Sequence, residues 1–540
     1  MTLPIASTAT LCFVVLVACS GSDDVPTRPE PLAALPLPAP ANTDRFVDSP
    51  VCGQCHLVGD TATALHDATG ANVSPVLLWR SSMMALAARD PYYLASFAEE
   101  AAGGKPGVEA LCTRCHSPAG SEERDTVGQH LGFADLTTGD DPASRLARDG
   151  VTCTACHQID PTNLGDEQSF SGGFTIGFGR KIYGPYLDPR TSPMMLIVNY
   201  TPTGGAHITK SELCATCHTV IIPTTNGSIT EQGTYLEWRS SSFRAMNQQC
   251  QTCHVPTIDA TGATIMTRAA GSPADLNPRS PIGKHVFVGG NSYVLSLIAD
   301  GLEWSGAGLS ADELAASVAR DQLHLTTAAH ITIGSITRTG DAVSFPVHVQ
   351  NLTGHKLPTG YPSRRMWIHL TVTAGGATVF ESGGVDATGA LVDAAGTVLP
   401  AQPHRDTVAS SDEVQVWEAA FVDRLGQPTH RTTEAAHYSK DDRILPAGFA
   451  PSPTDATRIS PVGVIADPTF VPGSDDVTYT LAGIPAGATI TATLAFQVLR
   501  PELVEAVEAS STPAGSRFVD LARARPDLPV VMAEVSALAP

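Results

Sequence analysis

Residues 211–218 read Ser-Glu-Leu-Cys-Ala-Thr-Cys-His, and the pattern Cys-x-x-Cys-His inside this stretch decides how the chain is organised. The pattern occurs five times and contains ten of the twelve cysteines. It is the attachment signature of c-type haem, because two thiols at this spacing can form thioethers with one porphyrin while the adjacent imidazole reaches the iron. The cysteines are Cys52, Cys55, Cys112, Cys115, Cys153, Cys156, Cys214, Cys217, Cys250 and Cys253, and the histidines are His56, His116, His157, His218 and His254.

Other interpretations of the pattern fit less well. Structural zinc does not require a histidine after every second cysteine, and a thioredoxin-like thiol pair would normally occur once, beside a βαβ unit. Chance would give on the order of one hundredth of such a motif in a chain of this composition. We therefore expect five covalently attached haem c groups, each with its iron.

The two remaining cysteines, Cys12 and Cys19, lie at the N-terminus. An apolar run from Leu11 ends in Leu16-Val-Ala-Cys19, which resembles a bacterial lipoprotein signal with its lipobox. The resemblance implies that residues 1–19 are a signal peptide, that Cys19 is acylated, and that the exported protein is lipid-anchored in the periplasm or at the cell surface, with the outer membrane as the expected site. No Lys or Arg precedes the run, so an ordinary signal peptide whose cysteine is discarded stays open.

Composition limits the partners. The formal charge is −21, which argues against nucleic-acid binding and leaves redox proteins and a membrane, reached through the lipid, as expected partners. Residues 20–47 are rich in Pro and Ala and are predicted to form a semi-extended tether. Every cysteine has an assignment, so no disulfide framework is expected.

The five motifs predict a haem domain over residues 48–290. About forty residues per haem are too few to build a separate apolar core around each porphyrin, so the haems themselves should form much of the core. We expect short helices at the attachment motifs joined by long irregular connections. Close packing of the haems is also what electron transfer requires.

The composition changes after His285. A helical stretch around residues 311–325 is predicted within a connector, residues 291–330, and residues 331–540 are predicted to form an antiparallel β-sandwich. Apolar residues alternate with polar ones in three segments, around 343–349, 366–372 and 490–498. The predicted fold class is therefore α+β, with a mostly irregular, short-helix multihaem domain followed by a β-sandwich that has no recognisable catalytic motif. The sandwich is expected to dock partners and cover the haems, or to be a passive structural module.

The haem region resembles a known superfamily. Tyr-Leu-Glu-Trp-Arg-Ser-Ser ahead of Cys250-Gln-Thr-Cys-His-Val-Pro, and His207 ahead of Ser211, are similar to bacterial multihaem cytochromes. That superfamily includes tetrahaem electron carriers, pentahaem nitrite reductase and hydroxylamine oxidoreductase. The resemblance covers roughly residues 48–290 and implies haem binding rather than a particular reaction. No motif here ends in Lys, unlike in nitrite reductase, and five motifs are too few for the octahaem enzymes.

The sixth ligand of each iron decides between a carrier and an enzyme, since an open position allows chemistry. Four histidines are the best-placed candidates for the sixth position, with a weaker fifth that competes with methionine on a predicted helix running to Ala88. The four are His130, His207, His285 and His355, the fifth is His66, and the methionines are Met83 and Met84. Each histidine also has an ordinary interpretation as a surface or hydrogen-bonded imidazole.

Two functions remain open from the sequence. The first is an exported electron-transfer protein, and the alternative is a multihaem oxidoreductase acting on a small nitrogen or sulfur compound at one open haem. His355 lies in Thr353-Gly-His-Lys-Leu-Pro-Thr-Gly, a loop expected to reach a haem from the β-domain. His404 is expected to lie on an ordinary surface loop.

Overall fold

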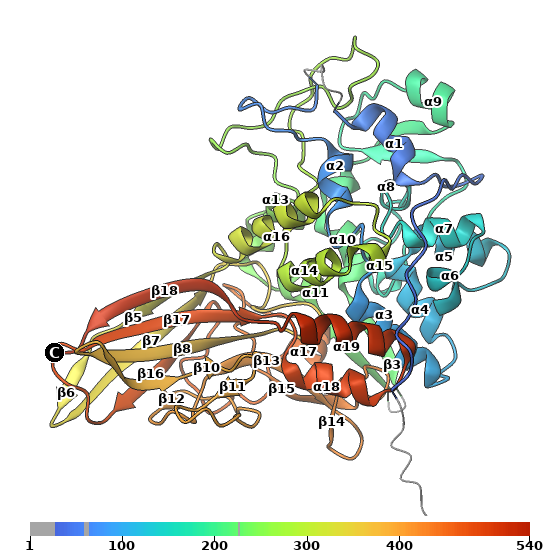
Figure 1. Ribbon diagram of the computed structural model, residues 1–540. Helices are drawn as coiled ribbons and strands as arrows, with labels where there is room; N and C mark the ends of the chain where they lie inside the picture. The colour runs from blue at the N-terminus through green and yellow to red at the C-terminus, as the bar shows by residue number, and fades with distance from the viewer. Residues whose placement is uncertain (1–27, 59–63, 225–226) are drawn as a thin grey trace, which may run out of the picture.

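The computed structural model describes residues 28–58, 64–224 and 227–540. It is mixed α+β, as predicted, with short helices in the N-terminal half and two antiparallel sheets in the C-terminal half. Figure 1 shows the two halves side by side, with the long strands extending away from the helices. The predicted signal segment with Cys12 and Cys19 lies outside the described residues.

The N-terminal half is built from short helices, many of which begin at a capping residue or a proline. Asp90, for example, accepts backbone hydrogen bonds from Tyr92 and Tyr93 at the start of α3. The helices are α1 (Ser49–His56), α2 (Pro75–Arg80), α3 (Pro91–Ala102), α4 (Val108–His116), α5 (Pro118–Thr126), α6 (Phe133–Thr137), α7 (Pro142–Arg148), α8 (Cys153–Cys156), α9 (Ser192–Val198), α10 (Ser211–His218), α11 (Thr234–Arg239), α12 (Ser242–Ala245) and α13 (Cys250–His254), with 3-10 turns η1 (Glu167–Ser169) and η2 (Ala206–Thr209).

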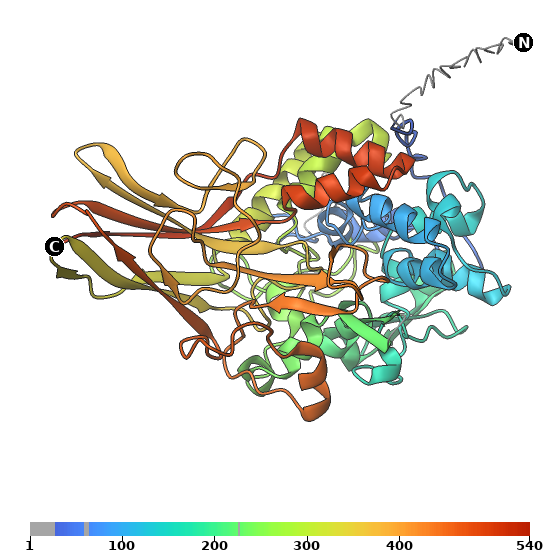
Figure 2. The same cartoon turned by 90° about the horizontal axis from the view of Figure 1, so that it is seen from below.

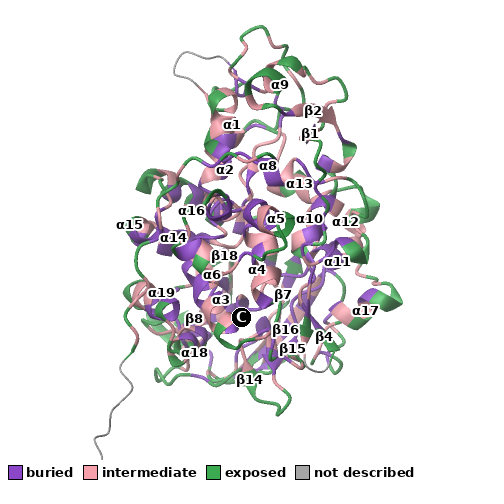
Figure 3. Ribbon diagram, turned by 90° about the vertical axis from the view of Figure 1, so that its right-hand side faces the viewer, coloured by how far each residue is buried: buried purple, intermediate pink, exposed green. Residues whose placement is uncertain are grey.

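Long connections and small sheets complete this half. The parallel pair β1 (Lys181–Gly184) and β2 (Thr201–Gly204) and the hairpin β3 (Val220–Thr224) and β4 (Gly227–Gln232) carry the chain between motifs. Helix α9 has no buried residue and lies at the outer edge of the molecule (Figure 3). The predicted helix through Met84 is wrong, because α2 ends at Arg80 and turns follow to residue 89.

Three helices occupy the predicted connector. They are α14 (Ser292–Asp300), α15 (Leu302–Ser305) and α16 (Ala311–Leu325), the last at the predicted helical stretch. Helix α16 begins with a capping box, in which Ser310 Oγ accepts the Glu313 N–H and the Glu313 carboxylate accepts the Ser310 N–H.

The C-terminal half is a sandwich of two sheets. One sheet has the order β12-β16-β7-β5 with β6 beside β7, and the other has the order β14-β13-β8-β17-β18 with β15 beside β13 and β9 beside β8. All pairs are antiparallel except β12 with β16. The strands are β5 (Ala329–Ile333), β6 (Thr337–Thr339), β7 (Ala342–Asn351), β8 (Arg365–Ala374), β9 (Ala377–Ser382), β12 (Thr407–Val408), β13 (Val416–Val422), β14 (Pro428–Thr429), β15 (His437–Asp441), β16 (Ser474–Leu481), β17 (Thr489–Gln497) and β18 (Val530–Leu538), with the small hairpin β10 (Gly384–Val385) and β11 (Leu391–Val392) outside them.

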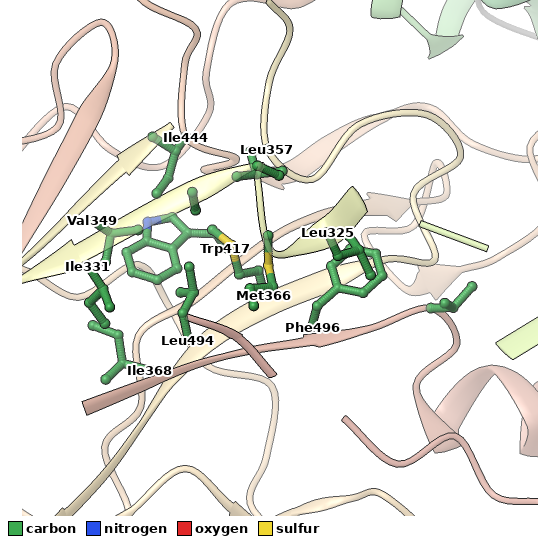
Figure 4. Packing of buried hydrophobic residues seen from close by; sticks show 14 of the residues in the cluster. Leu325, Ile331, Val349, Leu357, Met366, Ile368, Trp417, Ile444, Leu494 and Phe496 are labelled. Carbon is green, nitrogen blue, oxygen red and sulfur yellow. The ribbon is translucent and has the colours of Figure 1, made fainter. Parts of the chain in front are cut away.

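The predicted alternation of inward and outward residues is confirmed in β7, β8 and β17. The inward residues, including Val343, Ile368 and Leu494, are fully buried between the sheets. Figure 4 shows Trp417 and Met366 at the centre of this packing. The same core continues through Tyr293 and Leu297 of α14 to Tyr92 and Ala95 of α3, so one apolar core joins the two halves.

The predicted β-domain contains helices that were not expected. These are α17 (Pro453–Ile459), α18 (Pro501–Ala509) and α19 (Pro513–Ala524), and α19 packs against α3 of the N-terminal half. Figure 2 shows the red C-terminal helices lying beside the blue ones. The sequence does contain a helical pattern here, because the apolar residues Leu503 and Val507 lie four positions apart. Both side chains are buried in α18.

The predicted tether is wrong for its described part, residues 28–47. The Leu32 N–H donates to the Pro513 carbonyl and the Leu35 N–H to the Trp304 carbonyl, each at 2.8 Å, and Leu35 is buried. Prolines prevent helix formation but leave intervening N–H groups and leucines available for packing. This stretch therefore binds to the C-terminal and connector helices instead of standing away from them.

None of the helices in the described part of the chain is both long and apolar enough to cross a bilayer.

Candidate functional site

Each of the five motifs lies on a short helix that stops at the motif. Helices α1, α4, α10 and α13 end at the motif histidine, and α8 ends one residue before His157. Residues three and four apart share one helix face, so both thiols and the imidazole of a motif project to the same side. This is the arrangement that a single porphyrin requires. We number the motifs first to fifth along the chain.

The motif imidazoles are oriented by the backbone. Nδ1 lies 2.7–3.1 Å from a carbonyl oxygen in four motifs, and in the remaining motif His218 lies beside the Gln232 side chain, which raises its pKa. An Nδ1–H bonded to a carbonyl leaves the Nε2 lone pair free for a metal. The four pairs are His56 with Ala269, His116 with Ala87, His157 with Tyr183 and His254 with Val288.

Burial keeps these groups neutral. It lowers the pKa of all five motif histidines, and that of His116 and His254 to about 4. Burial likewise raises the pKa of the Cys156 thiol to about 12. The motifs therefore present neutral imidazoles, which is the form that ligates iron.

The motifs touch one another. Cys153 raises the pKa of the neighbouring Cys52 thiol, Cys217 that of Cys115, and Cys250 that of Cys214, so these thiols lie side by side. These contacts join the first motif to the third, the second to the fourth, and the fourth to the fifth. Cys156 lies near Cys217, which joins the third to the fourth. The fourth motif is thus the common neighbour of the second, third and fifth.

His285 faces the third motif. Its ring centroid is 6.2 Å from that of His157 and the two planes differ by 25°. A metal bound to two imidazole nitrogens, each about 2 Å away, separates the ring centroids by roughly 6 Å. The Nδ1 of His285 is tied to the Gly283 carbonyl at 3.0 Å, so its Nε2 is free as well. The pair therefore has the spacing of two imidazoles that share one iron.

His355 and His207 are also placed near motifs. His355 lies on the loop between β7 and β8, with Nδ1 2.8 Å from the Lys356 carbonyl, and it is close enough to His218 and His254 to lower the pKa of both further. His207 meets the Ile159 carbonyl with Nε2 at 2.9 Å and lies edge-on to Tyr183. His207 therefore uses Nε2 for its hydrogen bond and leaves Nδ1 free, whereas His285 and His355 use Nδ1 and leave Nε2 free.

The remaining candidates are less constrained. His66 has Nδ1 3.1 Å from the Ala64 carbonyl, and Met84 lies partly buried in the turns after α2. The His130 side chain is 72% exposed beside Asp125. None of these three has a ring contact with a motif histidine among the described residues.

Sequence reasoning missed His324. It lies in the last turn of α16, and its ring centroid is 5.5 Å from that of His254. The residue resembles any polar position near the end of an amphipathic helix, so the sequence offered no signal for it.

The expectation that His404 lies on an ordinary surface loop is wrong. Its side chain is only 5% exposed and donates from Nδ1 to Asp442 and from Nε2 to Asp467, each at 3.0 Å. Burial opposes a charge here, but the hydrogen bonds to the two carboxylates raise the pKa of His404 above its ordinary value. His404, Asp467 and Asp475 bring ligand atoms within 4.8 Å of one another. Because both ring nitrogens already serve carboxylates, this is an ion-pair cluster.

This cluster predicts a pH-dependent stability. A histidine whose pKa is raised by folding stabilises the fold at low pH, and the gain disappears as pH rises through its folded-state pKa. We expect His404→Gln to lower the free energy of unfolding by about 3 kcal/mol at pH 6, where the imidazole is charged between two carboxylates, and by much less at pH 9. Urea unfolding at the two pH values measures this.

The matched control is His369→Gln. His369 pairs with Glu381 on β9, but both side chains are at least a third exposed, so the loss should stay under about 1 kcal/mol. An equal loss for His404→Gln at both pH values would contradict the charged state of the cluster.

The comparisons with known proteins address the fold. No family model matches the chain, and no curated protein matches it. Among solved structures, the chain is similar to a penta-heme cytochrome c552 from Thermochromatium tepidum, with a TM-score of 0.50 and 16% sequence identity over 92% of this chain and 99% of that chain. The similarity spans both halves.

The fold class follows from these observations. The chain has the fold of a multihaem cytochrome, with a helical half and a β-sandwich in one continuous body. On this fold, the chain has five Cys-x-x-Cys-His motifs.

Proposed function

We propose that the chain binds five haem c groups covalently and transfers electrons among them. The observation that carries the proposal is the set of five Cys-x-x-Cys-His helices, which present neutral imidazoles and place each motif's thiols beside those of another motif. Each thiol pair would hold a porphyrin through thioethers, and each free Nε2 would ligate its iron. Bound haem iron would take up and release one electron at a time.

The order of contacts between motifs supports a particular route. The first motif adjoins the third, the third adjoins the fourth, and the second and fifth both adjoin the fourth. Electrons entering near the first motif would therefore have two exits. Two exits suit a protein that exchanges electrons with separate donor and acceptor proteins, which we propose as its partners.

The alternative function, reduction or oxidation of a small nitrogen or sulfur compound, requires an open iron position. EPR of the oxidised protein distinguishes the two. We expect low-spin signals from five haems and no change on addition of nitrite or hydroxylamine. A high-spin haem that binds either compound would overturn the carrier proposal in favour of the oxidoreductase.

Export is part of the proposal and rests on the N-terminal sequence. We propose that the protein is exported and anchored by a lipid on Cys19, with the outer membrane as the expected site. The prediction concerns residues outside the described part of the chain. Labelled fatty acid should enter the parent but not Cys19→Ala, and equal labelling would remove the anchor.

A further inference from the structure

We infer that His324 is the sixth ligand to the iron of the haem held by the fifth motif, opposite His254. The inference rests on the proposed function. The two rings have centroids 5.5 Å apart with planes at 63°. The separation is close to the roughly 6 Å of two imidazoles on one metal, and the rings need not be parallel, because each needs only its nitrogen to point at the iron.

The ring of His324 is available for this role. The Nδ1 of His254 is committed to the Val288 carbonyl at 2.7 Å, which leaves its Nε2 free. No described residue hydrogen bonds to a ring nitrogen of His324. The side chain is half-buried, and this burial lowers the pKa of His324. Both ring nitrogens of His324 are therefore available to a metal.

Helix α16 is fixed relative to the fifth motif. Asp321, one turn before His324, is buried and accepts the Gly289 N–H at 3.1 Å. The neighbouring residue, Val288, is the one whose carbonyl orients His254. Both imidazoles are therefore positioned from the same two-residue segment, which sets the distance between them.

A second set of contacts fixes the other end of the helix. Ser317 Oγ lies 2.8 Å from Ser81 Oγ, and Arg80 forms an ion pair with Glu313 at 2.5 Å. Arg80 ends α2, which packs against α1 of the first motif. Helix α16 thus cannot slide without breaking contacts at both ends, as expected of a helix that supplies a ligand.

His355 is the competing ligand for this iron. It lowers the pKa of His254 more than His324 does and also lowers that of His218, so it lies near both the fourth and the fifth motifs. The ring contact with His254, however, is made by His324. Assigning His324 to the fifth motif leaves His355 available for the fourth.

Spectroscopy of four single variants, at His324, His330 and His355, tests the inference. His324→Ala should keep five haems by mass but convert one haem in five from low-spin to high-spin in the EPR spectrum. His324→Met should remain fully low-spin and raise the potential of one haem, because thioether ligation favours ferrous iron. His330→Ala is the matched control, since His330 is exposed on β5 six residues further on, and it should match the parent.

Different results would contradict the assignment of His324 and the proposed function on which it rests. If His324→Ala keeps every haem low-spin while His355→Ala does not, His355 is the ligand and the inference is overturned. If His324→Met leaves all potentials unchanged, His324 is a packing residue. A parent protein without five haems would instead remove the proposed function on which the inference rests.

Discussion

The variant His285→Ala is expected to convert one of the five haems from low-spin to high-spin and to raise its reduction potential. The reason is that His285 faces His157 at 6.2 Å between ring centroids with nearly parallel planes, while Nδ1 of each ring is tied to a carbonyl oxygen. Removing one imidazole removes a ligand that stabilises ferric iron. EPR and a spectroelectrochemical titration would measure both effects.

The environment of His285 makes this variant informative. The ring is buried, which lowers its pKa to about 4, and it lies edge-on to Phe287 at 5.7 Å. Alanine therefore leaves a gap in which water could bind the iron weakly, giving the high-spin state. The control is His437→Ala, an exposed histidine on β15. If both variants keep the parent's spin state, His285 is not a ligand.

The second large effect is expected at Glu237, whose replacement by alanine should cost about 3 kcal/mol or more of the free energy of unfolding. Glu237 lies fully buried on α11 and accepts the Lys356 N–H at 3.1 Å and the Thr359 hydroxyl at 2.6 Å. Arg443 approaches the same carboxylate at 3.4 Å. These contacts tie the loop that carries His355 to the haem-binding half.

The charges in this cluster balance, which explains the size of the effect. Lys356 and Arg443 both pair with Asp441, at 2.6 Å and 2.7 Å, so two buried cations face two buried carboxylates. Burial alone would raise the pKa of Asp441, but the two cations bring it down to about 2. Removing Glu237 leaves two cations with one carboxylate in a buried site. This uncompensated charge is the costly outcome.

Urea unfolding measures the loss, and Glu303→Ala on α15 is the control because Glu303 is exposed. Glu237→Ala should also disturb one haem spectrum, since the loop with His355 is no longer held in place. A loss below 1 kcal/mol together with an unchanged spectrum would mean that the two halves are not coupled through this cluster.

The sequence predicted the features that depend on local pattern. The five motifs and the alternating strands are short-range signals, and β7, β8 and β17 bury the residues that alternation selected. The helical stretch around residues 311–325, which forms α16, is equally local. Each of these features can be recognised from the pattern of residues in a short stretch of sequence.

The rest depends on contacts between distant segments. His324 meets His254 across seventy residues of chain, and His404 is enclosed by carboxylates from later loops. The tether was misjudged for the same reason, because its proline content is local while its contact with α19 is not. Histidine roles in this chain are set by tertiary packing, which periodicity does not report.

Mass spectrometry of the mature protein tests the central claim most directly. Five covalent haem adducts on one chain, with no free thiol between residues 48 and 540, is the predicted result, since each of the ten motif cysteines would be consumed by a thioether. Four or fewer adducts in fully matured protein, or a motif cysteine that remains free to alkylation, would contradict it.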